Sequence, residues 1–158
     1  MELAPRDGSI CEAGKKANLV GKYHQASTVA YRHVADEIEF CLITTINKGR
    51  WGFPKGNIED GESPADAALE EALEEAGLRG QITDPPLGEY EFRKLGKRRN
   101  VVVLLLHVDE VKKVWPEAGR RKRRWVAPDK ARQLLHREQL ERFIDLALDR
   151  IGHMKAVG

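Results

Sequence analysis

The sequence predicts an α/β protein of one domain, in which a mixed β-sheet is flanked by helices. Three observations support this fold class. The chain has 158 residues, which is enough for one domain with a sizeable hydrophobic core. Hydrophobic residues make up 41% and charged residues 33%, as in ordinary globular proteins. Strand-like and helix-like segments follow one another without regular alternation, so a mixed sheet is favoured.

The N-terminal part of the chain predicts an arm followed by two strands. Residues 1–22 show little periodicity and are expected to form a flexible N-terminal arm. Ser27–Val34 is a candidate strand, and the β-branched, apolar segment Ile38–Ile46 predicts a second, well-buried strand. Residues 51–62 are rich in Gly and Pro and are expected to form a loop.

The helix after this loop has clear ends in the sequence. Ser63 suits the N-cap, Pro64 the first helical position and Gly77 the C-terminal cap. Helical spacing places the apolar residues on one side, namely Ala65, Ala68, Leu69, Ala72, Leu73 and Ala76. It places the glutamates on the other side, namely Glu70, Glu71, Glu74 and Glu75. We therefore expect an amphipathic helix whose polar face is entirely acidic.

A connector and a pair of strands are predicted next. Residues 80–87 contain Pro85 and Pro86 and are expected to lead from the helix back to the sheet. Glu89–Phe92 and Val101–Val108 predict paired strands, with a basic turn between them.

The C-terminal third predicts a short strand and two helices. Arg123–Val126 is a candidate strand and Pro128–Leu135 a short helix. Apolar residues recur at helical spacing through Glu138–Ile151, which is expected to form the longer helix. No internal repeat or second domain is visible, so we place a single domain at residues 23–152 and a C-terminal tail at 153–158.

The cysteines and the hydropathy narrow the class of protein. Cys11 and Cys41 match neither a disulfide framework nor a metal-ligand spacing, so free thiols and a cytoplasmic protein are expected. The longest apolar run, Val101–Leu106, is far shorter than the ~18 residues of a membrane span. Met1–Asp7 lacks the apolar stretch of a signal peptide. We therefore expect neither a membrane partner nor a secretory leader.

An acidic segment carries the strongest functional signal. Eight carboxylates fall between Glu59 and Glu75, and no Lys or Arg lies between Gly56 and Leu78. Glu71 lies three residues before Glu74 and four before Glu75, so these side chains share a helical face. Hard dications such as Mg²⁺ prefer carboxylate oxygens, and a bound dication polarises phosphoryl groups and activates water. A solvated acidic helix without metal is the alternative interpretation.

The spacing of these residues resembles the signature of the Nudix hydrolases, Gly-x5-Glu-x7-Arg-Glu-apolar-x-Glu-Glu-x-Gly-apolar. Its positions are matched by Gly56, Glu62, Glu71, Ala72, Glu74, Glu75, Gly77 and Leu78. The resemblance implies an α/β/α sandwich and metal-dependent hydrolysis of phosphoanhydrides. It implies that Glu71, Glu74 and Glu75 bind Mg²⁺ or Mn²⁺, with the Gly56 carbonyl as a further ligand. Glu62 is then expected to support these ligands or to activate water, and Glu117 is a further candidate ligand from a later loop.

One position departs from this signature, because Glu70 stands where the family has Arg. The resemblance implies that the family's Arg orients the neighbouring glutamates. Two outcomes remain open. In the first, Glu70 adds an acceptor and tightens metal binding. In the second, Glu70 makes the metal-free site more repulsive and raises the carboxylate pKa values. We expect the second outcome, and therefore weaker catalysis when metal is limiting.

Two basic blocks suit a polyanionic substrate such as a polyphosphate. Residues 93–99 hold five cations in seven positions, and residues 120–124 are all cationic. With Trp51-Gly-Phe-Pro-Lys-Gly56, these blocks are similar to segments of the diadenosine and diphosphoinositol polyphosphate phosphohydrolases. The candidate substrate-binding residues are Lys55, Lys97, Arg98, Arg121 and Arg123. Trp51 and Phe53 suit either nucleobase stacking or packing, whereas Trp125 is expected in the core.

The favoured function is metal-dependent hydrolysis of dinucleoside or diphosphoinositol polyphosphates. Hydrolysis of ADP-ribose or of RNA 5′ ends is the alternative within the same chemistry. The RNA variant rests on the basic blocks, since attraction to phosphates is independent of base sequence. A nucleotide-binding module with weakened catalysis is a further alternative because of Glu70, although the retained glutamates oppose it. Nucleic acid is the less favoured partner class.

Overall fold

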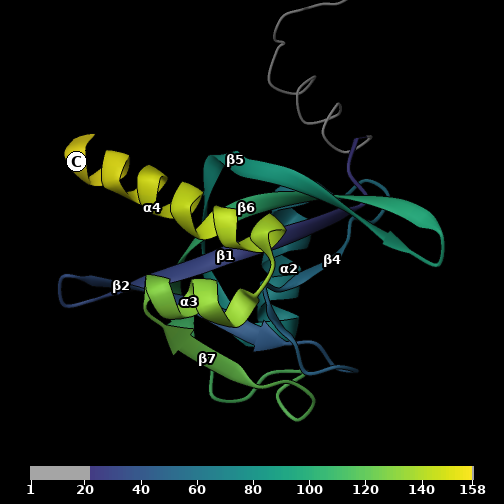
Figure 1. Ribbon diagram of the computed structural model, residues 1–158, viewed down its shortest axis with the longest axis horizontal. Coiled ribbons are helices and arrows are strands. Elements are labelled where there is room, and N and C mark those ends of the chain that lie inside the picture. The colour runs from purple at the N-terminus through teal and green to yellow at the C-terminus, as the bar shows by residue number, and fades with distance from the viewer. Residues whose placement is uncertain (1–21, 158) are drawn as a thin grey trace, which may run out of the picture.

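The computed structural model describes residues 22–157, in which the strands form one mixed sheet (Figure 1). Its main path runs in the order β3 (Trp51–Gly52), β2 (Glu37–Thr44), β1 (Gln25–Val34), β6 (Lys97–Val111) and β5 (Leu78–Lys94). Two shorter strands lie off this path, since β4 (Lys55–Asn57) pairs with β1 and β7 (Arg123–Val126) pairs with β2. The pair β1–β6 is parallel and the other pairs are antiparallel, so the predicted mixed sheet is confirmed.

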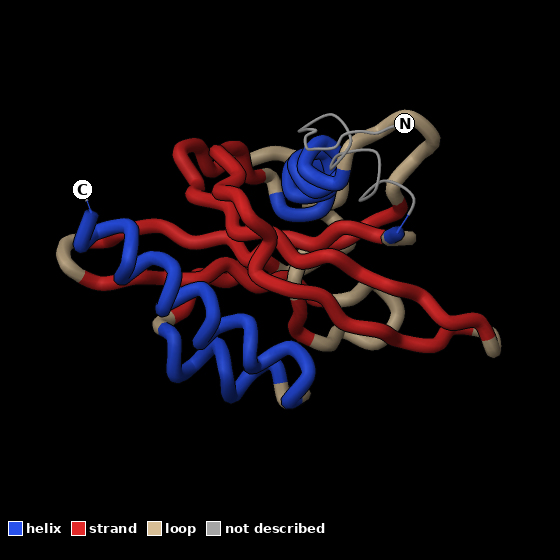
Figure 2. Tube along the Cα trace, turned by 90° about the horizontal axis from the view of Figure 1, so that it is seen from above, coloured by secondary structure: helices blue, strands red, loops and turns tan. Residues whose placement is uncertain are grey.

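Helices cover both faces of this sheet (Figure 2). Helix α2 (Pro64–Ala76) lies on one face, and α3 (Pro128–Leu135) and α4 (Glu138–Val157) lie on the other. Along β6, Val103 and Leu105 pack into the core shared with α4, whereas Leu104 and Leu106 pack into clusters shared with α2. This is the alternation that a strand buried on both faces produces. The predicted α/β/α sandwich is confirmed.

The sheet is more extensive than the sequence predicted. Residues 80–87 are not a connector but part of β5, because the ladder with β6 includes Ile82 opposite Leu106. The register shifts between Thr83 and Gly88, and such an irregularity accommodates the two prolines, which lack a ladder N–H. The predicted loop at 51–62 contains the short strands β3 and β4.

The two ends of the chain were predicted to be an arm and a tail. Residues 1–21, which include most of the predicted arm and Cys11, lie outside the described residues. In the predicted tail, α4 continues past the buried Ile151 to Val157, and residues 152–155 are exposed. Among the described residues, no helix is long and apolar enough to cross a membrane.

Candidate functional site

Helix α2 carries the acidic residues and is fixed by local contacts at both ends. At its start, Ser63 Oγ accepts a hydrogen bond from the Asp66 N–H at 3.1 Å, and Pro64 follows the cap. At its end, Gly77 adopts a left-handed conformation with φ of 68°, and its N–H donates to the Leu73 carbonyl. Both predicted ends of this helix are confirmed.

The four glutamates of α2 do not share one exposed face. Glu70 and Glu74 are exposed and Glu71 is half-buried, but Glu75 has only 9% of its surface exposed. Position 75 is seven residues after the buried Ala68, which places the two only ~20° apart around a helix. The predicted all-acidic polar face is therefore wrong for Glu75, whose carboxylate turns inward.

A close approach between β4 and α2 brings Gly56 against Glu71. A Cβ atom at Gly56 would lie 2.2 Å from Glu71 Cδ and 2.5 Å from Oε2, so a glycine leaves room for this carboxylate. The preceding residue of β4, Lys55, donates its main-chain N–H to Glu75 Oε1 at 3.1 Å. The structure thus brings Gly56, Glu71 and Glu75 together along one short strand.

Negative charge is in excess within this cluster. Burial, together with repulsion from Glu75 and Glu74, raises the pKa of Glu71 to about 8. Burial also raises the pKa of Glu75, although the nearby Arg121 guanidinium opposes this shift. Near neutral pH the cluster is therefore stabilised by taking up a proton or by binding a cation.

The donor set fits a hard dication such as Mg²⁺ or Mn²⁺. Carboxylate oxygens and a main-chain carbonyl are the donors that these ions prefer, and a cation would relieve the repulsion around Glu71. Within residues 22–157, no three acidic, His or Cys side chains already converge as a metal cluster. Glu71 and Glu74 would therefore have to turn their carboxylates toward an ion shared with Glu75.

Glu62 and Glu70 form the outer part of the acidic region. Glu62 lies in the loop before α2, where its Oε1 accepts the Glu59 N–H and its own N–H donates to the Glu59 carbonyl, both at 3.0 Å. Repulsion from Glu62 is the main cause that raises the pKa of Glu70, with a smaller contribution from Glu74. Glu70 is in turn a minor cause of the raised pKa of Glu71, so the extra negative charge at position 70 also reaches a candidate metal ligand.

Residues 112–123, here called the capping loop, wrap around the C-terminal turn of α2. This turn carries no basic residue of its own, so its last carbonyls need donors from elsewhere. The Glu74 carbonyl accepts the Glu117 N–H at 3.1 Å, and the Glu75 carbonyl accepts Trp115 Nε1–H at 3.0 Å. The capping loop therefore holds the helical turn that presents the candidate metal ligands.

Arg121, predicted to bind substrate, has partners within the protein. Its Nη2 lies 3.2 Å from Glu75 Oε2, and its Nε lies 2.6 Å from Glu117 Oε1. Its Nη1 donates to the Thr44 carbonyl at 2.9 Å. Glu117, the candidate ligand from a later loop, is thus held near Glu75 through Arg121.

Arg123, also predicted to bind substrate, supports the same helix end. Its Nη1 donates to the carbonyls of Ala76 and Lys112, both at 2.8 Å. Its guanidinium lies over the ring of Trp115 at 4.0 Å. These contacts attach the capping loop to the end of α2.

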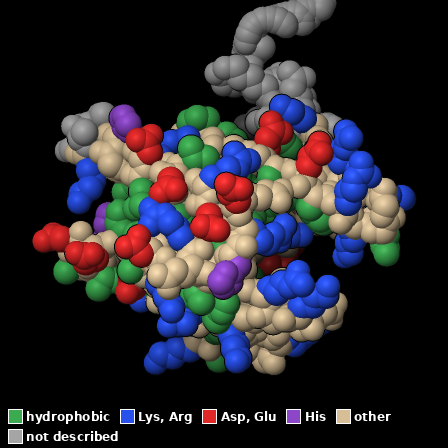
Figure 3. Space-filling model, in the orientation of Figure 1, with side chains coloured by type: hydrophobic (Ala, Val, Ile, Leu, Met, Phe, Trp, Pro, Cys, Tyr) green, Lys and Arg blue, Asp and Glu red, His purple; other side chains and the backbone are tan. Residues whose placement is uncertain are grey.

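The remaining basic candidates, Lys97 and Arg98, lie at the tip of the β5–β6 hairpin. Figure 3 shows Lys and Arg side chains gathered over this hairpin. Both residues are exposed, and Arg98 Nε lies 3.5 Å from the carboxylate of Glu91. Neither residue lines the cavity described next.

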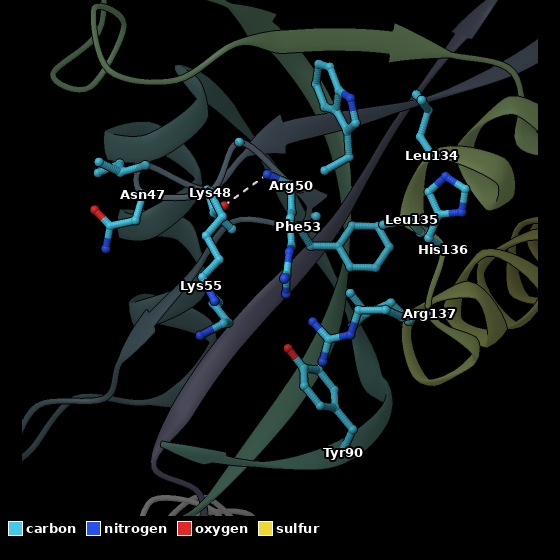
Figure 4. A pocket seen from close by; sticks show the side chains of 16 residues that line it. Asn47, Lys48, Arg50, Phe53, Lys55, Tyr90, Leu134, Leu135, His136 and Arg137 are labelled. Carbon is cyan, nitrogen blue, oxygen red and sulfur yellow. Dashed lines mark hydrogen bonds between the residues drawn. The ribbon is translucent and has the colours of Figure 1, made fainter. Parts of the chain in front are cut away.

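A cavity of about 710 Å³ opens between the loop after β2, strand β5 and the connection from α3 to α4 (Figure 4). Its aromatic lining is Trp51, Phe53 and Tyr90, and its basic lining is Lys48, Arg50, Lys55 and Arg137. In Figure 4, the Arg137 side chain extends between Phe53 and Tyr90. Lys55 joins this cavity to the acidic cluster, because its side chain lines the cavity and its N–H binds Glu75.

Sequence reasoning identified only part of this lining. Trp51 and Phe53 were expected to stack or to pack, and Phe53, which is 8% exposed, both packs in the core and lines the cavity. Lys48 and Arg50 were missed, although two cations within three residues before an aromatic residue are a usable local signal. Arg137 offered no local signal, because it reaches the cavity only through the packing of α3 and α4 on the sheet. Trp125 packs against the core, as predicted.

Comparison with known proteins agrees with this architecture. The NUDIX domain family matches residues 24–147, which is more than half of the chain. Nudix hydrolase 4 of Arabidopsis thaliana is 39% identical over 114 residues, which cover 66% of this chain and 54% of that protein. This chain therefore spans about half the length of that relative.

Two further similarities concern proteins with named substrates. Diphosphoinositol polyphosphate phosphohydrolase 3-beta of Bos taurus is 29% identical over 127 residues, which cover 75% of this chain and 76% of that protein. The crystal structure of the C. elegans Ap4A hydrolase is similar with a TM-score of 0.70 at 23% identity, covering 82% of this chain and 98% of that one. At this identity, the similarity to the C. elegans structure shows the fold alone.

Proposed function

The chain belongs to the Nudix family, and from this premise we propose that it is a pyrophosphohydrolase that cleaves phosphoanhydride bonds with the help of a divalent metal. Dinucleoside polyphosphates are the substrates that we favour. The observation that carries this choice is the cavity, which combines aromatic and cationic side chains and adjoins the acidic cluster at Lys55.

The acidic cluster is the proposed metal site. Glu71, Glu74, Glu75 and the Gly56 carbonyl would hold Mg²⁺ or Mn²⁺, which when bound polarises a phosphoryl oxygen and lowers the pKa of water. The chain itself keeps the ligands in place, because β4 lies directly against Glu71 and the Lys55 N–H orients Glu75. Glu62, in the loop before α2, is the proposed residue that helps to activate water.

The cavity is the proposed site for the nucleoside end of the substrate. A nucleobase would stack on Trp51 or Tyr90, and such stacking contributes about 1–3 kcal/mol per base. The phosphates would then run past Lys55 toward α2, with Arg50 and Arg137 as further cationic partners. An inositol polyphosphate has no aromatic ring to stack. The aromatic lining therefore favours a nucleotide, and the similarity to the bovine protein makes a diphosphoinositol polyphosphate the second candidate.

Two further roles belong to this proposal. Lys97 and Arg98 would act at longer range, because exposed cations raise the local concentration of a polyanion without touching it in the site. We place the protein in the cytoplasm, where the free thiol of Cys41 remains reduced. Cell fractionation tests this location.

Product analysis with two substrates tests the proposed function. Diadenosine tetraphosphate and a diphosphoinositol polyphosphate are each incubated with the protein, with and without Mg²⁺ or Mn²⁺. We expect metal-dependent release of nucleotides from the first substrate. Trp51→Ala is expected to raise KM for this substrate about 10- to 100-fold, with little effect on KM for the inositol substrate.

The control for this experiment truncates an apolar side chain outside the cavity. Val114 is 82% exposed, so Val114→Ala should leave both KM values unchanged. Binding of nucleotides without turnover at saturating metal would refute the hydrolase and favour a nucleotide-binding module. An equal increase of KM for both substrates in Trp51→Ala would show that Trp51 acts by packing rather than by stacking.

A further inference from the structure

The buried carboxylate of Glu75 requires a positive charge that its own helix does not contain. No Lys or Arg lies between Gly56 and Leu78, and the side chain of Glu75 is only 11% exposed. A buried carboxylate is unfavourable unless it is paired and hydrogen-bonded. The main-chain N–H of Lys55 reaches Oε1 of Glu75 and Arg121 reaches Oε2. Of these two groups, only the Arg121 guanidinium carries a full positive charge.

Arg121 is itself buried and connects three parts of the fold. Its side chain is 13% exposed, and its three nitrogen atoms contact Glu75 in α2, Glu117 in the capping loop and the Thr44 carbonyl at the end of β2. A planar guanidinium presents its donors in fixed directions, so it can hold several acceptors at once in one geometry. With its nitrogens already engaged inside the protein, Arg121 is poorly placed to bind a substrate phosphate.

We propose that Arg121 is a positioning residue for the metal site. It pairs with both Glu75 and Glu117 in the metal-free protein and fixes their carboxylates relative to the sheet, so that a dication meets an ordered site. This inference rests on the proposed function, since it takes Glu75 to be a metal ligand. The capping loop thereby supplies the cation that the acidic helix lacks.

Thermal unfolding with and without Mn²⁺ tests the electrostatic part of this proposal. In EDTA, Arg121→Ala should lower the midpoint of unfolding by about 5–10 °C, because the buried carboxylate of Glu75 and the partly buried carboxylate of Glu117 lose their partner. Arg121→Lys should cause a smaller decrease. Arg120→Ala removes the same charge from an exposed neighbour and should have almost no effect.

Mn²⁺ should raise the midpoint of Arg121→Ala more than that of the native protein, because the metal replaces the missing charge. An equal loss with and without Mn²⁺ would overturn the proposal.

The kinetic parameters distinguish positioning from substrate contact. For a positioning residue, Arg121→Ala should lower kcat by about 100-fold, since displaced groups near the reacting atoms have effects of this size. KM should stay within about threefold of the native value, because substrate contacts are intact. Arg121→Lys should recover part of kcat. A higher KM with unchanged kcat would instead make Arg121 a substrate contact and overturn the proposal.

A double-mutant cycle separates failure of this inference from failure of the proposed function. Arg121→Ala, Glu117→Gln and the double variant are compared in EDTA, where neither metal nor substrate takes part. We expect the combined loss to be clearly smaller than the sum of the single losses. Additive losses would overturn the pairing, whatever the activity of the protein. Absence of Mn²⁺ binding to the native protein by calorimetry would instead refute the proposed metal site, even if the cycle shows coupling.

Discussion

Gly56→Ala should disturb the geometry of the acidic cluster while changing the stability of the fold little. A methyl group at this position would lie 2.2 Å from Glu71 Cδ and 2.6 Å from Cγ, whereas carbon atoms in contact lie ~3.5–4.0 Å apart. The Glu71 carboxylate must therefore move by more than about 1 Å. The end of a flexible side chain can make this movement, and Gly56 does not have a left-handed backbone that would exclude alanine.

The expected effects on activity and on stability differ in size. A displacement of about 1 Å near the reacting groups typically lowers the rate about 100-fold, or about 2.7 kcal/mol in the activation free energy. The free energy of unfolding should change by less than about 1 kcal/mol, because alanine lowers the entropy of the unfolded chain and offsets part of the strain.

Two measurements on the same preparations check this prediction. They are kcat/KM for diadenosine tetraphosphate at saturating Mg²⁺, and unfolding in urea. Gly119→Ala is the matched control, because a Cβ atom at Gly119 would meet nothing within 4 Å. Native activity in Gly56→Ala would refute the placement of Glu71 in the working site. A large loss of stability would show that the fold cannot absorb the displaced carboxylate.

Three further predictions concern charge and burial. Glu70→Arg should raise activity at limiting Mg²⁺, because it removes a carboxylate that helps to raise the pKa of Glu71; equal or lower activity in a Mg²⁺ titration would contradict this. Arg123→Ala should lower the free energy of unfolding in urea by about 2–3 kcal/mol, since two carbonyls lose a charged donor, whereas exposed Arg124→Ala should change it little. Burial raises the pKa of Cys41 to about 12, so in a Cys11→Ser background a thiol reagent at pH 8 should label the protein only after denaturation.

The parts of the fold that local chemistry determines were predictable from the sequence. The bounds of α2 follow from a capping serine, a proline in the first turn and a terminal glycine, each of which acts within one turn of the helix. Strand β5 was predicted only in part, because Pro85 and Pro86 are typical of connectors and nothing local indicates a strand there. Its course is set by the long partner β6, whose ladder continues on both sides of the prolines.

The candidate site shows the same division between local and distant causes. The spacing of Glu71, Glu74 and Glu75 indicated a metal site, because neighbours on one helix are fixed by helical geometry. The inward turn of Glu75 and the cavity lining of Arg137 were not predictable in this way. They depend on which surfaces meet when α2 and the α3–α4 pair pack on opposite faces of the sheet.

The basic run at residues 120–124 contains a pattern that its total charge conceals. The run leads from a turn at Arg120 into strand β7, in which successive side chains point to opposite sides. Arg120, Lys122 and Arg124 are exposed, whereas Arg121 and Arg123 turn toward the protein. Cations that turn inward need acceptors, and the end of α2 offers both a buried carboxylate and unpaired carbonyls without any cation of its own. By this alternation, the run divides into two residues that support the acidic helix and three that are exposed on the surface. The total charge of the run does not reveal this division, and for that reason the sequence led us to predict phosphate binding for Arg121 and Arg123.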